Sequence, residues 1–458
     1  MSVNVSKNTT LVVFSIFSFV IAFITSAVNI ALPSMGKELA MEVVLMGWVN
    51  NAMILAVAAV LLPAGRIADI YGRKKIFSYG ILLFAVSSFF CAMANSGILI
   101  IIFRVLQGIS AGMTIGTSVA ILTSVFPIEE RGRALGVSVA SVYLGLSIGP
   151  FLGGVLTQYL GWRSIFFLST GLGVFVIALV FWKLRGEWAD ARGEKFDIIG
   201  SIAFSLSIVM VLYGFSVLPA IPGIVLIVLG VLVTLGFIRW EAKVESPILD
   251  ISLLRKNTVF VFSNVATLIN YCATTAVIFL LSLYLQYIQE LSPQVAGLIL
   301  LTQPAIMSVV SPFSGRLSDR MDPPILAAIG MAFNFVALLL FVFLTNETTL
   351  VFIVISLAIF GFGMGFFVSP NTSAVMGSVG KKILGVASGT QASMRNVGMA
   401  LSMGIVMILF SVYIGDAQIS PEYYPAFLVS MKVGFMIFAA LCFGGIFAQL
   451  AGRGVNRQ

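Results

Sequence analysis

Histidine is absent from this sequence, and cysteine and charged residues are scarce. Without histidine, the chain has no side chain whose ordinary pKa lets it change charge near neutral pH. The three cysteines, Cys91, Cys272 and Cys442, each lie inside an apolar run. This placement is typical of packing residues and disfavours both a disulfide framework and a metal cluster. We therefore expect no metal and no other cofactor.

The scarcity of charge excludes an ordinary soluble protein. Only 10% of the 458 residues are charged, 59% are hydrophobic, and the mean hydropathy is +1.09. So little polar surface cannot cover a soluble globule of this size. Apolar stretches of roughly 20 residues, the length a helix needs to cross a bilayer, recur along the whole chain. We predict an all-α integral membrane protein with about 14 transmembrane helices.

The apolar stretches fall into a block of six, a pair and a second block of six. We expect residues 1–190 to form an N-terminal six-helix bundle, 191–256 a linker with two extra transmembrane helices, and 257–458 a C-terminal six-helix bundle. An even number of spans places both termini on one side. Nearly all the lysines and arginines between the spans lie on that side, and such loops stay in the cytoplasm. The prediction is a multi-pass protein of the inner or plasma membrane with cytoplasmic termini. The net charge of +8 reflects this topology and gives no reason to expect a nucleic-acid partner.

Two loops repeat each other at matching places in the two blocks. GRIADIYGRKK (residues 65–75) and GRLSDR (residues 315–320) each link the second and third spans of their block, so Gly65 matches Gly315 and Asp69 matches Asp319. Short cytoplasmic loops also converge on glycine, arginine and aspartate simply to turn tightly. The longer copy favours two halves built from one plan, with a substrate pathway between them.

The motifs resemble those of the major facilitator superfamily over nearly the whole chain. GRIADIYGRKK is similar to the family's signature between spans two and three. Further matches are RVLQGISAG (104–112) in the fourth span, GLSIGPFLGG (145–154), which resembles an antiporter signature found mainly in exporters, VNIALP (28–33) and ASGTQASMRNVG (387–398). The last two and the extra helix pair resemble the fourteen-span drug:proton antiporter branch, of the multidrug efflux type. The resemblance implies the major facilitator fold, two pseudo-symmetric six-helix bundles plus the central pair.

The resemblance also implies a conformational latch at the cytoplasmic ends. It would involve Gly65, Asp69, Gly72 and Arg73, with Gly315 and Asp319 in the second copy. From the residues alone, glycines permit a tight loop, and Asp69 can pair with a basic neighbour or lie at a helix N-terminus. Such contacts would form in one conformation and break in another.

The antiporter motif contains small residues at four-residue spacing, namely Gly145, Gly149 and Gly153, with Gly154 and an interrupting Pro150. This ladder lets two helix backbones approach closely. It indicates either a tight helix contact alone or a contact that also bends or slides during transport.

Charged residues at membrane depth are expensive and therefore informative. Only Arg104, Arg395 and Lys432 are expected there. Arg104 either forms a polar cluster with Gln107 and Asn29 or extends its side chain to the water at the membrane surface, which is called snorkelling. Arg395 either lines the pathway or pairs with backbone carbonyls, and Lys432 is predicted to be a snorkelling anchor. The predicted substrate pathway is lined by Asn29, Arg104, Gln107, Asn264, Asn270, Tyr271, Gln303, Gln391 and Arg395.

The sequence departs from the drug:proton branch at one position. That branch usually carries an aspartate five residues before Asn29, where this chain has Ile24. We therefore expect weak proton coupling or none through this site, and we expect Ile24→Asp to increase recognition of cationic compounds. Without a buried anion, the cavity favours neutral, aromatic or anionic amphiphiles.

These patterns predict a secondary transporter that works by alternating access and exports hydrophobic or amphiphilic small molecules, with proton coupling open. Transport of an anionic metabolite or lipid is the alternative, because both buried arginines are cationic. A membrane enzyme is disfavoured by the lack of histidine and of a carboxylate pair, and a receptor is disfavoured by the repeat. The expected partners are a small molecule, the lipid bilayer and, if coupled, protons.

Overall fold

The computed structural model describes residues 7–184, 186–189, 191–244, 257–380, 384–415 and 417–452. Fourteen helices in these ranges are long and apolar enough to cross a membrane, which confirms the predicted all-α fold class.

The N-terminal bundle consists of α1 (Lys7–Glu38), α2 (Val43–Tyr71), α3 (Arg73–Met93), α4 (Gly97–Val125), α5 (Ile128–Leu160) and α6 (Arg163–Lys183). The extra pair is α7 (Ile198–Ser216) and α8 (Ile221–Glu241). The C-terminal bundle consists of α10 (Thr258–Leu283) with its π-helical extension η1 (Tyr284–Ile288), α11 (Pro293–Leu300), α12 (Thr302–Ser318), α13 (Pro323–Val342), α14 (Leu350–Gly377), α15 (Leu384–Tyr413), the short η3 (Pro421–Tyr423) and α16 (Tyr424–Ala451).

Local sequence explains where several helices begin and break. Backbone groups in lipid must be satisfied within the segment, so long apolar runs become helices. Asn257 and Ser292 cap α10 and α11, because their side-chain oxygens accept hydrogen bonds from Phe260 and Val295 backbone N–H groups. The segment Pro293–Ser318, which counts as one of the fourteen spans, is divided at Leu301 into α11 and α12. Pro304, which lacks an N–H and crowds the preceding turn, follows this break.

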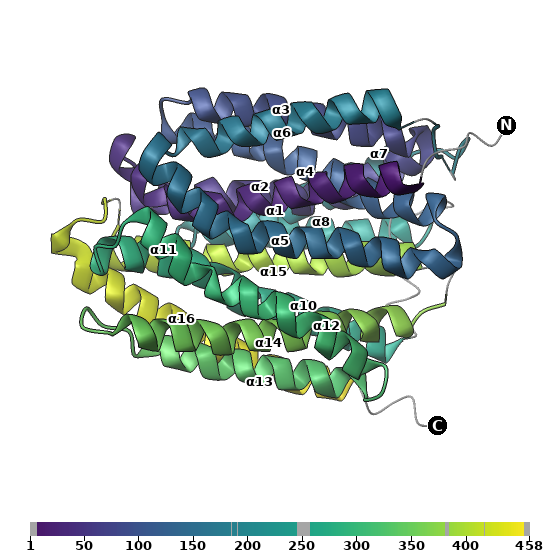
Figure 1. Cartoon of the computed structure of the whole chain (residues 1–458). Helices are drawn as coiled ribbons and strands as arrows, with labels where there is room; N and C mark the ends of the chain where they lie inside the picture. The colour runs from purple at the N-terminus through teal and green to yellow at the C-terminus, as the bar shows by residue number, and fades with distance from the viewer. Residues whose placement is uncertain are drawn as a thin grey trace.

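Each bundle packs mainly on itself, as Figure 1 shows with the purple and blue helices above the green and yellow ones. Within the N-terminal bundle α1 packs on α5 and α2 on α4, and within the C-terminal bundle α13 packs on α14 and α16. The two bundles meet where α2 contacts α15 and where α5 contacts α11. Helix α7 lies beside both α2 and α15, and α8 packs on α7. The extra pair therefore covers one of the two seams between the bundles.

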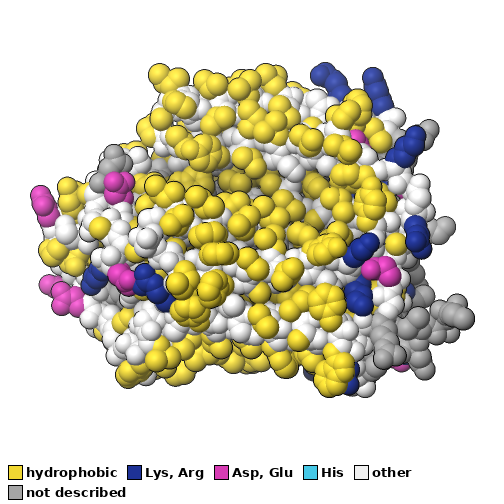
Figure 2. All heavy atoms as spheres, turned by 90° about the horizontal axis from the view of Figure 1, so that it is seen from above, with side chains coloured by type: hydrophobic (Ala, Val, Ile, Leu, Met, Phe, Trp, Pro, Cys, Tyr) yellow, Lys and Arg dark blue, Asp and Glu magenta, His cyan; other side chains and the backbone are white. Residues whose placement is uncertain are grey.

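The surface separates into an apolar band and two charged ends. Figure 2 shows the band across the middle of one face, with charged side chains gathered at its two ends. The start of α1 and the end of α16 lie at one end (Figure 1). We call this the basic end, which includes Lys7, Arg66, Lys74, Lys75, Lys243, Arg316 and Arg320. The opposite, acidic end includes Glu38, Glu42, Glu290, Glu347 and Glu422 with Lys37 and Arg163.

Candidate transport site between the two bundles

A polar cluster lies midway along the helices, where the two bundles face each other. Arg395 of α15 and Tyr271 of α10 are half-buried, and their side chains lie close enough to interact. Tyr143, near the middle of α5, contributes from the other bundle and lies close to Ser311 of α12. The charge of Arg395 also acts on Tyr143. We call Arg395, Tyr271, Tyr143 and Ser311 the central cluster.

The central cluster has cationic character without a balancing acid. Every aspartate and glutamate that belongs to a described membrane-spanning helix lies within about a turn of a helix end, as Asp69 does in α2 and Glu241 in α8. A cation at membrane depth is costly unless it is hydrated, hydrogen-bonded or paired. The half-buried Arg395 guanidinium and two phenols can therefore donate hydrogen bonds to an acceptor or an anion that enters between the bundles.

Arg104 belongs to a different place, inside the N-terminal bundle. Its side chain is 1% exposed, so it does not snorkel, and the snorkelling interpretation is wrong. Its Nε donates to the carbonyl oxygen of Val49 at 2.9 Å and its Nη1 to Gln107 Oε1 at 2.9 Å. Gln107 Nε2 donates in turn to Ser88 Oγ at 2.7 Å. This network ties α2, α3 and α4 together and does not include Asn29.

Asn29 instead lies where the bundles close at the acidic half of the molecule. Its side chain accepts a hydrogen bond from Asn50 Nδ2 at 2.5 Å. Its backbone carbonyl accepts from Ser282 Oγ of α10 at 2.7 Å.

Two more contacts extend this closure toward the acidic end. Gln286 Nε2 donates to the carbonyl oxygen of Ile30 at 3.0 Å, and Tyr287 Oη donates to that of Pro33 at 3.4 Å. Carbonyls of α1 thus hold α10 and η1 across the seam.

The remaining predicted pathway residues make contacts within the C-terminal bundle. Asn264 donates to the Phe260 carbonyl of its own helix. Asn270 is fully buried and accepts from Asn334 Nδ2 at 3.0 Å. Gln303 lies on α12 with its amide 3.7 Å from the Met307 sulfur. Gln391 donates to Thr372 Oγ1 at 3.3 Å. Among the predicted residues, only Tyr271 and Arg395 are brought together in the central cluster.

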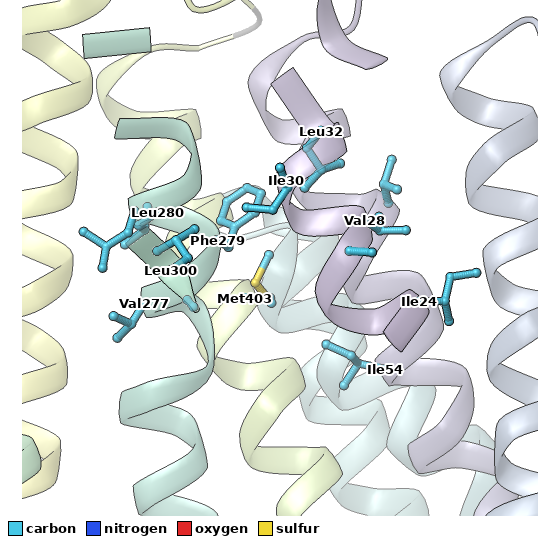
Figure 3. Close-up of a cluster of buried hydrophobic side chains, with 14 of the residues drawn as sticks. Ile24, Val28, Ile30, Leu32, Ile54, Val277, Phe279, Leu280, Leu300 and Met403 are labelled. Atoms are coloured by element: carbon cyan, nitrogen blue, oxygen red, sulfur yellow. The ribbon is translucent and has the colours of Figure 1, made fainter. Parts of the chain in front are cut away.

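Ile24 does not face the seam between the bundles. It is fully buried, and Figure 3 shows its side chain on the side of α1 that points away from α10 and α15. Ile30 lies on the other side of α1, toward Phe279 of α10 (Figure 3). A carboxylate at position 24 would therefore enter the packed interior of the N-terminal bundle rather than the space between bundles.

The first loop motif is held inside the N-terminal half. Asp69 Oδ1 accepts from Arg73 Nε at 2.7 Å and pairs with Nη2 at 2.6 Å. Arg73 Nη1 donates to Ser124 Oγ of α4 at 2.8 Å. Gly72 has φ 122°, a conformation that favours glycine.

The segment after α6 covers this loop. Glu187 lies directly over Gly72 and accepts from the Lys74 backbone N–H at 2.8 Å. The Trp188 carbonyl accepts from the Arg73 N–H, and the Ala191 N–H donates to the Asp69 carbonyl. In this structure the motif is therefore joined to the connector that leads to the extra helix pair.

The two copies of the loop differ in their surroundings. A Cβ on Gly65 would have no atom within 4 Å, whereas a Cβ on Gly315 would come 3.1 Å from Ser369 Oγ. Asp319 follows the last residue of α12 and is exposed, whereas Asp69 is half-buried.

The glycines of the antiporter motif face two different neighbours. A Cβ on Gly145 would lie 2.5 Å from the Phe19 carbonyl oxygen. A Cβ on Gly149 would collide with Ser26 Oγ. A Cβ on Gly153 would lie 2.7 Å from the Ala27 Cβ. These three glycines therefore let α5 pack closely on α1 within one bundle.

The other motif residues face the opposite bundle. A Cβ on Gly154 would collide with the Pro293 carbonyl oxygen, and one on Gly297 would collide with that of Pro150. The motif thus combines a contact within one bundle with a contact across the seam.

Sequence reasoning missed Tyr143 and Ser311, which complete the central cluster. A signal was present for Tyr143, because it precedes Gly145 of the antiporter motif by two residues. No comparable pattern marks Ser311, since serine is common in transmembrane helices and only the packing of α12 against α5 brings it to Tyr143.

A family model described as Major Facilitator Superfamily matches residues 14–403. The chain belongs to the major facilitator superfamily. This superfamily member is 28% identical over 424 residues to the riboflavin transporter RibZ of Clostridioides difficile, covering 92% of each chain. It is 26% identical to the multidrug resistance protein Stp of Mycobacterium tuberculosis, covering 92% of this chain and 78% of Stp. The human organic anion transporter MFSD10 (TETRAN) shares the fold, with a TM-score of 0.64 at 16% identity over 96% of this chain and 97% of that one. These similarities indicate a transporter rather than an enzyme.

Proposed function

We propose that this chain exports hydrophobic or amphiphilic aromatic molecules across the cell membrane by alternating access between its two bundles. The family and relatives named as multidrug resistance proteins support this proposal. RibZ is named as a transporter of riboflavin, which is a planar aromatic molecule, and this also supports the proposal. The export direction is supported by the resemblance of GLSIGPFLGG to an exporter signature.

The observation that carries the proposal is the central cluster. Tyr143 and Tyr271 offer aromatic faces with polar tips, and Arg395 offers a planar cation that stacks and hydrogen-bonds. Such a site suits an aromatic molecule with a polar or acidic edge. The absence of a carboxylate near mid-depth in the described helices favours, as the second candidate, export of an anionic metabolite or lipid.

The orientation follows from charge. Because lysine and arginine concentrate in cytoplasmic loops, we place the basic end in the cytoplasm. The hydrogen bonds that Asn29, Ile30 and Pro33 accept then close the extracellular side. This arrangement corresponds to a conformation in which the extracellular side is closed.

We further propose that residues 1–190 and 257–458 move as units during transport. In the opposite conformation the cytoplasmic ends would meet, and Asp69 and Arg73 would act as the latch that the family resemblance implies. The extra helices in 191–256 would follow the N-terminal unit, because the connector is hydrogen-bonded to its loop through Trp188 and Ala191.

Transport into proteoliposomes tests the proposed site. The substrates are a matched pair of aromatic dyes that differ only in a carboxylate or its methyl ester. Removing a hydrogen bond to a charged group weakens binding by about tenfold or more. We expect Arg395→Gln to reduce uptake of the anionic dye by that factor and to reduce uptake of the ester by less. We expect Tyr143→Phe to reduce uptake of both dyes modestly.

Lys243→Gln, an exposed change at the basic end outside the loop motifs, is the control and should have no effect. Equal transport of both dyes by Arg395→Gln and the unchanged protein would remove the central cluster as the substrate site. An imposed pH gradient in the same vesicles measures proton coupling, which we expect to be weak.

A further inference from the structure

A lone lysine lies on the lipid-facing side of the C-terminal bundle. Lys432 of α16 is exposed and has no ion-pair partner among the described residues. Its neighbours on this face are apolar, with Val429 45% and Met436 44% exposed. It lies eight residues after Tyr424, the first residue of α16, about 12 Å along the helix. A cation at this depth needs either water or an anion.

Lys432 borders a hollow of about 270 Å³. The walls come from Val342 and Phe343 at the end of α13, the following loop residues Leu344, Thr345 and Asn346, and Leu428 and Val429 of α16. The hollow therefore has an ammonium group and the polar groups of Thr345 and Asn346 beside an apolar surface. Phe343 is 70% exposed and extends that surface toward the bilayer.

The same loop supports the segment that closes the acidic end. The Tyr284 hydroxyl donates to the Thr345 carbonyl. Gln289 Nε2 donates to the Asn346 carbonyl at 3.2 Å and to the Tyr284 hydroxyl at 2.9 Å. Tyr284 begins η1, and Gln289 follows its last residue.

Two residues of η1 then reach the other bundle, because Gln286 and Tyr287 donate to carbonyls of α1. A continuous series of contacts thus joins the hollow to the closed seam.

We propose that the hollow binds the phosphate of an anionic phospholipid from the leaflet at the acidic end, and that this lipid stabilises closure of that end. Lys432 pairs with the phosphate and Asn346 hydrogen-bonds the headgroup or ester oxygens, while an acyl chain lies along Phe343 and Val429. Pairing with the lipid phosphate would offset the cost of holding the Lys432 ammonium group at membrane depth. Because a bound lipid orders the 344–346 loop, it favours the state in which η1 contacts α1.

Native mass spectrometry of the purified full chain tests binding, with phosphatidylglycerol and phosphatidylcholine as probes. We expect preferential retention of phosphatidylglycerol, reduced about tenfold by Lys432→Gln and restored by Lys432→Arg. Lys243→Gln, an exposed change at the basic end, should leave retention unchanged. Equal retention of both lipids, or no loss in Lys432→Gln, would overturn the site and leave Lys432 as a snorkelling side chain. Displacement by millimolar inorganic phosphate would overturn the assignment to a lipid.

The coupling to closure needs a separate measurement. Spin labels at Asn95→Cys and Gln418→Cys, both exposed at the acidic end on opposite bundles, report their distance by pulsed EPR in nanodiscs. Phosphatidylglycerol should enrich the short-distance population in the otherwise unchanged protein and not in the Lys432→Gln background. An identical distance distribution in both backgrounds would overturn the coupling.

Discussion

At the residue scale, the environment of a side chain decides its role more than its type does. Arg104 and Arg395 are both arginines at membrane depth, yet Arg104 is enclosed by α2, α3 and α4, whereas Arg395 is half-buried between the bundles. The enclosed guanidinium has its hydrogen bonds supplied by Val49 and Gln107. We therefore propose that Arg395, and not Arg104, meets a substrate.

The same reasoning changes the expected effect of Ile24→Asp. Because Ile24 is fully buried on the side of α1 away from the seam, a carboxylate there would be placed in apolar packing. We expect this variant to lose about 2.5 to 3.5 kcal/mol of stability, and to gain no recognition of cationic dyes. Thermal unfolding of the purified protein measures the first effect and dye transport the second. Ile24→Leu is the size-matched control and should unfold close to the unchanged protein, whereas a stable Ile24→Asp that exports cations would contradict the placement.

Asp69 provides a second prediction at this scale. Its partly exposed pair with Arg73 contributes little to stability, but a latch contact present in one conformation only shifts the equilibrium by about 1 to 3 kcal/mol. We expect Asp69→Asn to lower turnover several-fold while protein level and unfolding temperature change little. Glu130→Gln removes the exposed pair with Lys7 and should leave transport intact. Unchanged turnover in Asp69→Asn would remove the latch from the mechanism.

At the element scale, α5 has one face for its own bundle and one for the other. Gly145 contacts the α1 backbone, so a methyl group there must displace it, while Gly136 on the same helix has open space around it. Overpacking costs about 1 to 3 kcal/mol, and an alanine in open space improves helix propensity.

We therefore expect Gly145→Ala to lower the unfolding temperature by several degrees and Gly136→Ala to leave it unchanged or raise it. Differential scanning fluorimetry in one detergent compares the two. Equal behaviour of both variants would show that α1 and α5 do not pack this closely.

At the scale of the whole molecule, the membrane orientation can be tested by labelling. The three native cysteines are buried, so a thiol reagent that cannot cross the membrane will report only introduced sites. We expect Glu347→Cys, exposed at the acidic end, to be labelled on intact cells, and Met321→Cys, 45% exposed at the basic end, only after permeabilisation. Labelling of both sites on intact cells would contradict the placement of α13 across the membrane, and labelling of Met321→Cys alone would contradict the orientation.

The sequence alone determined the fold class, the fourteen spans and the family, because each depends on patterns local to a segment. Twenty apolar residues become a helix in lipid wherever they stand, and motifs such as GRIADIYGRKK are contiguous. The candidate site depends instead on which helix faces meet. Asn270 and Arg395 are both polar residues in apolar runs, and only packing directs the first to Asn334 and the second to Tyr271. Ile24 and Ile30 lie on one helix, yet the turn of that helix places them on opposite sides of it (Figure 3). Tyr143 and Ser311 are separated by more than a third of the chain, and the seam between two bundles, which no local pattern encodes, is what brings them together.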